Sequence, residues 1–231
     1  MSNLYIISLG GSLIIPKSQQ QINTTYLSRF KQLLSTHIQT GDSFILITGG
    51  GYLARHYQEA STKITDLSAG DKDWLGIYAT HLNAHLVRTI FQQWSYPEII
   101  IHPDTEYPDI EKYPLAIAGG WHPGNSTDYV AVCLAERFQA SFVINLSNID
   151  YVYTDDPETN PNAQALDNIS WVDFRDMVGN TWDPGASAPF DPIASKKAQE
   201  LNLPVTILNG EDIDNLDNYL NGNPFRGTTI Q

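Results

Sequence analysis

The chain has 231 residues, of which 42% are apolar and 17% are charged, and this is enough for one α/β domain with a substantial core. The net charge is −13, with only 13 Lys and Arg residues, so we expect no nucleic acid and no anionic membrane as a partner. The single cysteine, Cys133, excludes an internal disulfide and fits a reducing compartment, so we expect a cytoplasmic protein. We find no signal-peptide pattern and no apolar run near the roughly 20 residues of a membrane span.

Predicted strands and helices alternate along the chain. The strands are expected at 3–9, 43–48, 98–102, 114–118, 141–146 and 203–210, with an edge strand at 226–230. The helices are expected at 24–38, 52–60, 73–94, 126–138, from about 170 onward, and at 191–201, with a loop at 181–191. This alternation predicts an α/β fold with a mostly parallel central sheet and helices on both faces.

The predicted helix 73–94 has apolar residues on more than one face. Such a helix is either buried or shared with a second subunit, and we favour a subunit interface. The apolar residues are Trp74, Ile77, Tyr78, Leu82, Leu86, Val87, Ile90, Phe91 and Trp94.

Glycine clusters follow three of the predicted strands, at 10–11, 49–51 and 119–120. The carboxyl ends of parallel strands share one edge of a sheet, where ligands bind, so we expect the three clusters to lie together. A single cluster is often only a tight turn, but glycine-rich turns also present backbone N–H groups to anions. The pattern therefore favours a phosphate site, with the hydroxyl of Ser12 beside the first cluster.

Two segments near these clusters carry groups suited to phosphate chemistry. Arg55 lies one helical turn after the second cluster, and a guanidinium can bind two phosphate oxygens at once. A surface salt bridge with Glu59 explains Arg55 equally well. Thr127 and Asp128 begin a predicted helix, either as a cap with an acidic first turn or as groups that position a lysine or a hydrated Mg²⁺.

Other candidate residues are less decisive. Lys196 and Lys197 are adjacent on one helix, so at most one of them faces the ligand edge. The turn YTDDP at 153–157 is either a clamp for a base and ribose or an ordinary loop. His81 and His85 have a zinc-compatible spacing, but packing explains them better because no HExxH motif is present. No GxSxG motif supports a serine hydrolase.

Seven motifs occur in the order typical of the amino acid kinase fold, and the chain resembles the archaeal-type uridylate (UMP) kinases of that family. They are SLGGSL (8–13), TGGGYLARHY (48–57), KDWLGIYATHLNAHL (72–86), AGGWHPGNSTDYVA (118–131), NIDYVYTDDP (148–157), DPIASKKA (191–198) and RGTTI (226–230). The resemblance implies a three-layer α/β/α sandwich in one domain, 1–231, with an acceptor-binding part at about 1–140 and an ATP-binding part at about 141–231.

The resemblance implies that ATP phosphorylates UMP with the help of Mg²⁺, in a homo-oligomer built from dimers and hexameric in relatives. The catalytic residues implied are Gly10, Gly11, Ser12, Asp128 and Lys196. The acceptor-binding residues implied are Gly50, Gly51, Arg55, Asp73, Gly119 and Thr127. The ATP-site residues implied are Ser147, Tyr153, Asp156 and Pro157. No residue is assigned as a direct metal ligand.

Three positions depart from the family pattern. Ser8 stands where many members have lysine, and we expect Lys17 or extra backbone amides to compensate. Tyr151 stands where the family motif has glycine, which would cost on the order of 1 kcal/mol if that position had a left-handed backbone. His81 stands where relatives often have arginine.

These departures keep two other functions open. One is a catalytically weak nucleotide- or oxyanion-binding protein, such as the molybdenum storage proteins of the same fold. The other is a kinase for a different small phosphate or phosphonate acceptor. Arg55 argues against an isopentenyl phosphate kinase, since those relatives carry histidine at the matching position.

Overall fold

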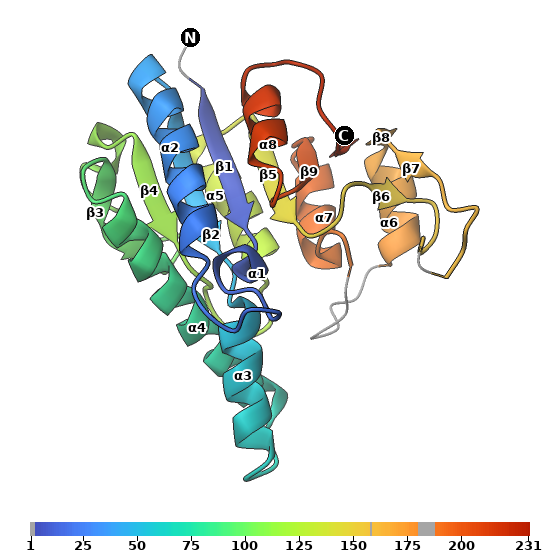
Figure 1. Cartoon of the computed structure of the whole chain (residues 1–231), viewed down its shortest axis with the longest axis horizontal. Coiled ribbons are helices and arrows are strands. Elements are labelled where there is room, and N and C mark those ends of the chain that lie inside the picture. Colours follow the sequence, from blue (N-terminus) through green and yellow to red (C-terminus); the bar gives the residue numbers. More distant parts are fainter. Residues whose placement is uncertain (1–2, 158, 180–187) are drawn as a thin grey trace.

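A computed structural model describes residues 3–157, 159–179 and 188–231. An eight-stranded sheet with the order β3-β4-β2-β1-β5-β9-β10-β8 forms its centre (Figure 1). Its strands are β1 (Leu4–Leu9), β2 (Ser43–Thr48), β3 (Ser95–Ile100), β4 (Leu115–Ala118), β5 (Phe142–Ser147), β8 (Asn168–Ile169), β9 (Val205–Asn209) and β10 (Thr228–Ile230). Only β10 and β9 pair in antiparallel fashion within this sheet as described, so the predicted mostly parallel sheet is confirmed.

Helices cover both faces of the sheet (Figure 1). The helices are α1 (Gly11–Ile14), α2 (Thr24–Thr40), α3 (Gly51–Thr62), α4 (Ala69–Ile90), α5 (Thr127–Phe138), α6 (Trp171–Val178), α7 (Pro192–Glu200) and α8 (Ile213–Leu220), with a short 3-10 turn, η1, at Ile110–Lys112. One core layer joins the sheet to α1, α2, α4 and α8. The other joins it to α5, α6 and α7. These two cores make the three-layer α/β/α sandwich.

The central strands are buried on both sides, which explains their continuous apolar sequences. Side chains alternate between the faces of a strand, and so Ile6 packs in the α5–α7 core while Ile7 packs in the α2–α4 core. The parallel register pairs Leu9 with Thr48 and Ile47 with Ala118. Each of these strands therefore ends at the same edge, and the three glycine clusters lie there together, as predicted.

The α4 helix begins and ends four residues earlier than the predicted helix 73–94. Ser68 caps it, since the Ser68 hydroxyl accepts a hydrogen bond from the Asp71 N–H at 3.1 Å. Near Phe91 the chain turns, and β3 begins at Ser95, earlier than predicted.

The C-terminal part differs most from the expectation. The strand predicted at 226–230 is present as β10, but its predicted edge position is wrong, because β10 lies between β9 and β8 inside the sheet. The elements α1, α8, η1 and β8 were not predicted, nor was the small hairpin of β6 (Val152–Tyr153) and β7 (Ala165–Leu166). Most of the predicted loop 181–191 lies outside the described residues.

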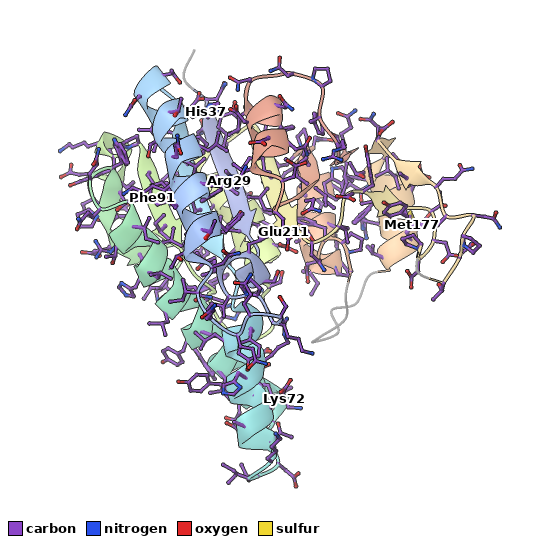
Figure 2. The ribbon with its side chains drawn as sticks, viewed as in Figure 1. Arg29, His37, Lys72, Phe91, Met177 and Glu211 are labelled. Carbon is purple, nitrogen blue, oxygen red and sulfur yellow. The ribbon has the colours of Figure 1, made fainter. Side chains whose placement is uncertain are left out.

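Helix α3 and the first turns of α4 project beyond the sheet edge (Figure 1), and Lys72 lies near the far end of this projection (Figure 2). Three large apolar side chains of α4 are exposed there: Trp74, Tyr78 and Leu82 are 44%, 65% and 60% accessible. Within the described residues, no helix is both long enough and apolar enough to cross a bilayer.

Candidate active site

The first two glycine turns touch each other through their backbones. A Cβ atom on Gly11 would lie 2.2 Å from the Gly51 nitrogen and 2.5 Å from the Gly49 oxygen, so no larger residue fits. Gly51 also has a φ of +57°, in the left-handed region that favours glycine. The Gly10 N–H donates to Leu146 O at 3.2 Å, and the Gly49 N–H donates to Leu9 O at 2.9 Å. These two amides fix the turns and are not offered to a ligand.

The third glycine turn is held by α4. The Gly119 N–H donates to Ile100 O at 3.1 Å, and the Gly120 N–H donates to the Thr80 hydroxyl at 2.7 Å. The ring Nε2 of His81 lies 2.7 Å from Gly120 O. Burial lowers the pKa of His81, so the neutral ring donates from Nε2. The amides of this turn therefore bind the protein itself, and they do not supply the anion contacts expected of them.

Asn83 of α4 braces the second glycine turn. Its side chain is buried, and its Nδ2 group donates to Gly49 O at 2.8 Å. Asn83 is not among the site residues predicted from the sequence. The available signal was a polar residue at an inward helical position, three residues after Thr80 and four before the buried Val87.

A cavity of about 210 Å³ opens between the second and third glycine turns and α4. It is lined by Gly50, Gly51, Ala54, Arg55, Gln58, Asp73, Gly76, Ile77, Thr80, Gly120, Asn125 and Thr127. The lining includes every expected acceptor-binding residue except Gly119, whose neighbour Gly120 takes that place. We call it the acceptor cavity.

The guanidinium of Arg55 is available at this cavity. Arg55 is exposed, and the structure gives it no ion pair with any described residue, so the alternative salt bridge with Glu59 is not formed. Arg55 follows the first turn of α3, where helix N–H groups lack intrahelical partners. A cation and the N-terminal turn of a helix thus meet at one wall of the acceptor cavity.

Asp73 and the start of α5 shape the opposite part of the lining. Asp73 Oδ2 accepts a hydrogen bond from the Gly124 N–H at 2.9 Å, which ties the 119–126 segment to α4. Ser126 caps α5, because its hydroxyl accepts from the Tyr129 N–H at 3.1 Å. Thr127 is the first helical residue, and Asp128 gives the helix its acidic first turn.

Asp128 belongs to a polar cluster beside the first glycine turn. Its Oδ1 accepts from the Ser8 hydroxyl at 3.1 Å and from Asn145 Nδ2 at 3.5 Å, and its Oδ2 accepts from the Asp191 N–H at 3.3 Å. Burial and the nearby negative charge of Asp191 raise the pKa of Asp128 to about 6. Ser8, which is 4% exposed, supplies a hydrogen bond but no compensating charge.

A second cavity of about 660 Å³ lies beyond the end of β5. It is lined by Ser147, Asn148, Ile149, Tyr151, Val152, Tyr153, Thr154, Asp155, Asp156, Pro157, Met177, Val178, Ala188 and Pro189. All four expected ATP-site residues are among them. We call it the donor cavity, and Met177 marks its position in Figure 2.

Tyr151 fits the donor cavity without backbone strain. It is not among the non-glycine residues with positive φ, so the cost foreseen for a left-handed tyrosine does not arise. Its ring packs edge-on against Tyr153, with centroids 6.3 Å apart. The substitution of glycine by tyrosine therefore adds an aromatic wall to the cavity.

The two adjacent lysines of α7 have different surroundings. Lys197 pairs with Glu136, with the charged atoms 2.6 Å apart, and Lys196 is exposed at the preceding position of α7. Neither Lys196 nor Lys17 lines the acceptor cavity or the donor cavity, so the roles expected of them stay predictions. Across the described residues, no group of three or more His, Cys, Asp or Glu side chains could hold a metal ion.

The first glycine turn lies between the two cavities, since β1 separates β2 from β5 in the sheet. The sequence profile of the amino acid kinase family matches residues 3–209. The chain belongs to the amino acid kinase family. Among relatives in this family, the chain is 30% identical over 227 residues to the uridylate kinase of Pyrococcus abyssi, covering 98% of both chains. It is 32% identical to the uridylate kinase of Hyperthermus butylicus, covering 92% of this chain and 95% of the relative.

Solved structures of the amino acid kinase fold agree with these matches. The crystal structure of uridylate kinase from Archaeoglobus fulgidus superposes with a TM-score of 0.83 at 26% identity, covering 98% of this chain and 99% of that one. A UMP kinase from Bacillus anthracis has a TM-score of 0.78 at 17% identity, covering 99% and 96% of the two chains, and supports the fold alone.

Proposed function

We propose that this member of the amino acid kinase family is a uridylate kinase, which transfers the γ-phosphate of ATP to the phosphate of UMP. One observation carries the proposal: the acceptor cavity and the donor cavity open at the same edge of the sheet, on either side of the first glycine turn. Two nucleotides bound there would face each other across Gly11 and Ser12. The relatives named uridylate kinase, matched over nearly the full chain, support UMP as the acceptor.

The acceptor phosphate binds at the wall formed by α3 in this proposal. Arg55 supplies a forked cation, and the first turn of α3, with Gly50 and Gly51, supplies backbone N–H groups. Asp73 accepts from the ribose hydroxyls, and Thr127 contacts the base side. The acceptor oxygen needs no general base, because the second pKa of a phosphate monoester is about 6 and the group is largely ionised.

The donor side binds ATP. Tyr151 and Tyr153 offer aromatic surfaces for a base, while Ser147, Asp156 and Pro157 complete the lining of the cavity. We assign Lys196, which is exposed on α7, to the ATP phosphates. The acceptor cavity uses only residues 50–127 and the donor cavity only residues 147–189, which supports acceptor-binding and ATP-binding parts of a single domain that meet near residue 140.

Asp128 is suited to hold the Mg²⁺ that the family resemblance implies. The carboxylates of Asp128 and Asp191 lie close together, and no cation among the described residues pairs with either, so a divalent ion would relieve their repulsion. Mg²⁺ is commonly held by one or two carboxylates together with substrate phosphates. When bound, it neutralises charge on the transferring phosphoryl group.

The residues of the protein itself align the two nucleotides for phosphoryl transfer. An oxygen of the UMP phosphate forms the new bond to the γ-phosphorus of ATP while the bond to the β–γ bridging oxygen breaks, giving UDP and ADP. Charge develops on the oxygens of the transferred group, and the α1 turn with Ser12 is placed to donate to them. Alignment and charge neutralisation supply most of the catalysis in phosphoryl transfer.

The proposal is tested by ADP release with UMP, CMP, AMP and isopentenyl phosphate as acceptors. We expect turnover with UMP above the others, and we expect Arg55→Ala to lower kcat/KM for UMP by about 100-fold or more, as typical for the loss of a charged phosphate contact. Arg29→Ala is the matched control, since Arg29 pairs with Asp214 at 3.2 Å on the exposed surface.

Two outcomes would contradict a uridylate kinase. ATP binding without turnover of any acceptor, with an oxyanion that co-purifies, would favour the storage-type alternative. Turnover of a phosphonate or another small phosphate in preference to UMP would favour the other kinase. The matches to uridylate kinases favour neither of these two alternatives.

A further inference from the structure

One buried polar atom of the acceptor cavity has no partner. The side-chain oxygen Oδ1 of Asn125 is buried and makes no hydrogen bond with any described residue, although Asn125 lines the cavity. The other polar groups nearby are engaged: the Thr80 hydroxyl donates to Ile77 O at 2.6 Å, and Gln58 Nε2 donates to Lys72 O at 2.8 Å.

The backbone around Asn125 is fixed before any ligand arrives. The Asn125 N–H donates to His122 O at 3.1 Å, closing a turn. Gly124 within this turn has a φ of +86°, and its N–H is held by Asp73. The unpartnered oxygen is therefore presented by an ordered segment and does not result from a loose loop.

A buried acceptor without a donor is unfavourable, and native proteins rarely keep one without a reason. Resting on the proposed function, we propose that Asn125 Oδ1 accepts a hydrogen bond from the ring N3–H of the acceptor base, and that Asn125 thereby selects uracil over cytosine. Arg55 and the α3 amides attract the phosphate to a wall built from other residues, which leaves Asn125 for the base. Cytosine has a lone pair at N3, so binding it in the same pose would require the Asn125 amide to turn its Nδ2 into the buried position that Oδ1 occupies.

Asn125→Leu tests the proposal, because leucine is similar in size and has no acceptor. The probes are UMP, CMP and 3-methyluridine 5′-monophosphate, whose ring lacks the N3–H, and the measurement is the dissociation constant of each with wild type and variant. We expect the preference of wild type for UMP over the methylated analogue to fall by about tenfold in Asn125→Leu, the typical effect of one hydrogen bond. The preference for UMP over CMP falls with it.

Asn125→Asp is the conservative variant. It keeps an acceptor oxygen and adds a negative charge, so it should weaken all three nucleotides while it keeps the preference for UMP over the methylated analogue. Melting temperature provides a further readout. Asn125 makes no side-chain hydrogen bond to a described residue, and so Asn125→Leu should melt no lower than wild type, whereas a structural role would lower the melting temperature.

An unchanged preference in Asn125→Leu, within about twofold, would overturn the role of Asn125 while leaving a wild-type enzyme that phosphorylates UMP. A preference lost equally in Asn125→Asp would also overturn it. Failure of the proposed function looks different, because wild type would then turn over no UMP in the ADP-release assay.

Discussion

At the scale of single residues, Ser8 and Asp128 define the electrostatics of the reaction centre. The hydroxyl of Ser8 occupies a buried position beside Asp128, where the family resemblance leads us to expect lysine. A hydroxyl stabilises the carboxylate through one hydrogen bond but leaves the charge of Asp128 and the adjacent Asp191 uncompensated. Burial, together with the uncompensated charge of Asp191, raises the pKa of Asp128 to about 6.

This pKa predicts how the stability of the ligand-free protein depends on pH. The folded pKa lies above the unfolded value, so the folded protein holds a proton on Asp128 that the unfolded chain releases from about pH 4 upward. The stability from this proton is fully present below about pH 4 and is lost as the pH rises through about 6. We expect Asp128→Asn to remove this decline, which is on the order of 1–3 kcal/mol.

Urea unfolding between about pH 4 and about pH 7 measures the effect. The exposed residue Asp66 offers a control, Asp66→Asn, whose curve should follow that of wild type. If the curves of Asp128→Asn and wild type run parallel through this range, the charge on Asp128 is compensated in a way that the structure does not show.

At the scale of elements, α4 organises the acceptor cavity. Three inward contacts come from this one helix: Thr80 and His81 hold Gly120, and Asn83 holds Gly49. The helix thus sets the distance between the second and third glycine turns, and a small shift of α4 would change the width of the cavity.

Asn83→Leu should therefore weaken both the fold and acceptor binding. The change leaves the Gly49 carbonyl without its donor, at a cost of about 1–3 kcal/mol in unfolding free energy, and it should raise KM for UMP more than KM for ATP. Thermal melts and steady-state kinetics measure the two effects. Thr89→Ala on the exposed side of the same helix is the control, and equal changes in both KM values would argue against a specific role at the acceptor turn.

The existence and the start of α4 were predictable from the sequence, but its contacts with the glycine turns were not. The long apolar pattern identified the helix, and the Ser68 cap with Asp71 three residues later was a readable signal for its true start. The bracing role of Asn83 was not readable, because it depends on a contact with a turn 34 residues away in the chain. For the same reason, the sequence indicated Arg55 as a phosphate ligand but could not exclude its pairing with Glu59.

At the scale of the whole molecule, the exposed side of α4 indicates assembly. Trp74, Tyr78 and Leu82 together form an apolar face on the projecting helix, and monomeric proteins rarely expose such a continuous face. We propose that two copies pack through it, which is also what the resemblance implies for the oligomer.

Leu82→Glu tests this assembly, because a buried unpaired carboxylate is strongly unfavourable at an apolar interface. Sedimentation velocity should show wild type as a dimer or larger, and Leu82→Glu as a smaller species at micromolar concentration. Val172→Glu, on exposed α6, is the matched control and should assemble as wild type does. A monomeric wild type would refute the interface.

The sequence predicted the overall sheet well where local pattern suffices. Apolar β-branched runs ending in glycine gave the parallel strands and their shared edge, and alternation of helices gave the layers. It failed at β10, because the neighbours of a strand are set by pairing with distant segments. Thr228 shows this: its hydroxyl accepts from the Val152 N–H at 2.8 Å and donates to Leu166 O at 2.5 Å, contacts that no local pattern encodes.

The placement of β10 inside the sheet has a consequence for biosynthesis. The strands that carry the acceptor cavity come from the first half of the chain, and they can pair while translation continues. The hairpin that borders the donor cavity is anchored by Thr228, which follows Val152 by 76 residues in the chain. During synthesis the acceptor cavity can therefore take shape early, whereas the donor cavity gains its anchor only after these 76 further residues have been translated.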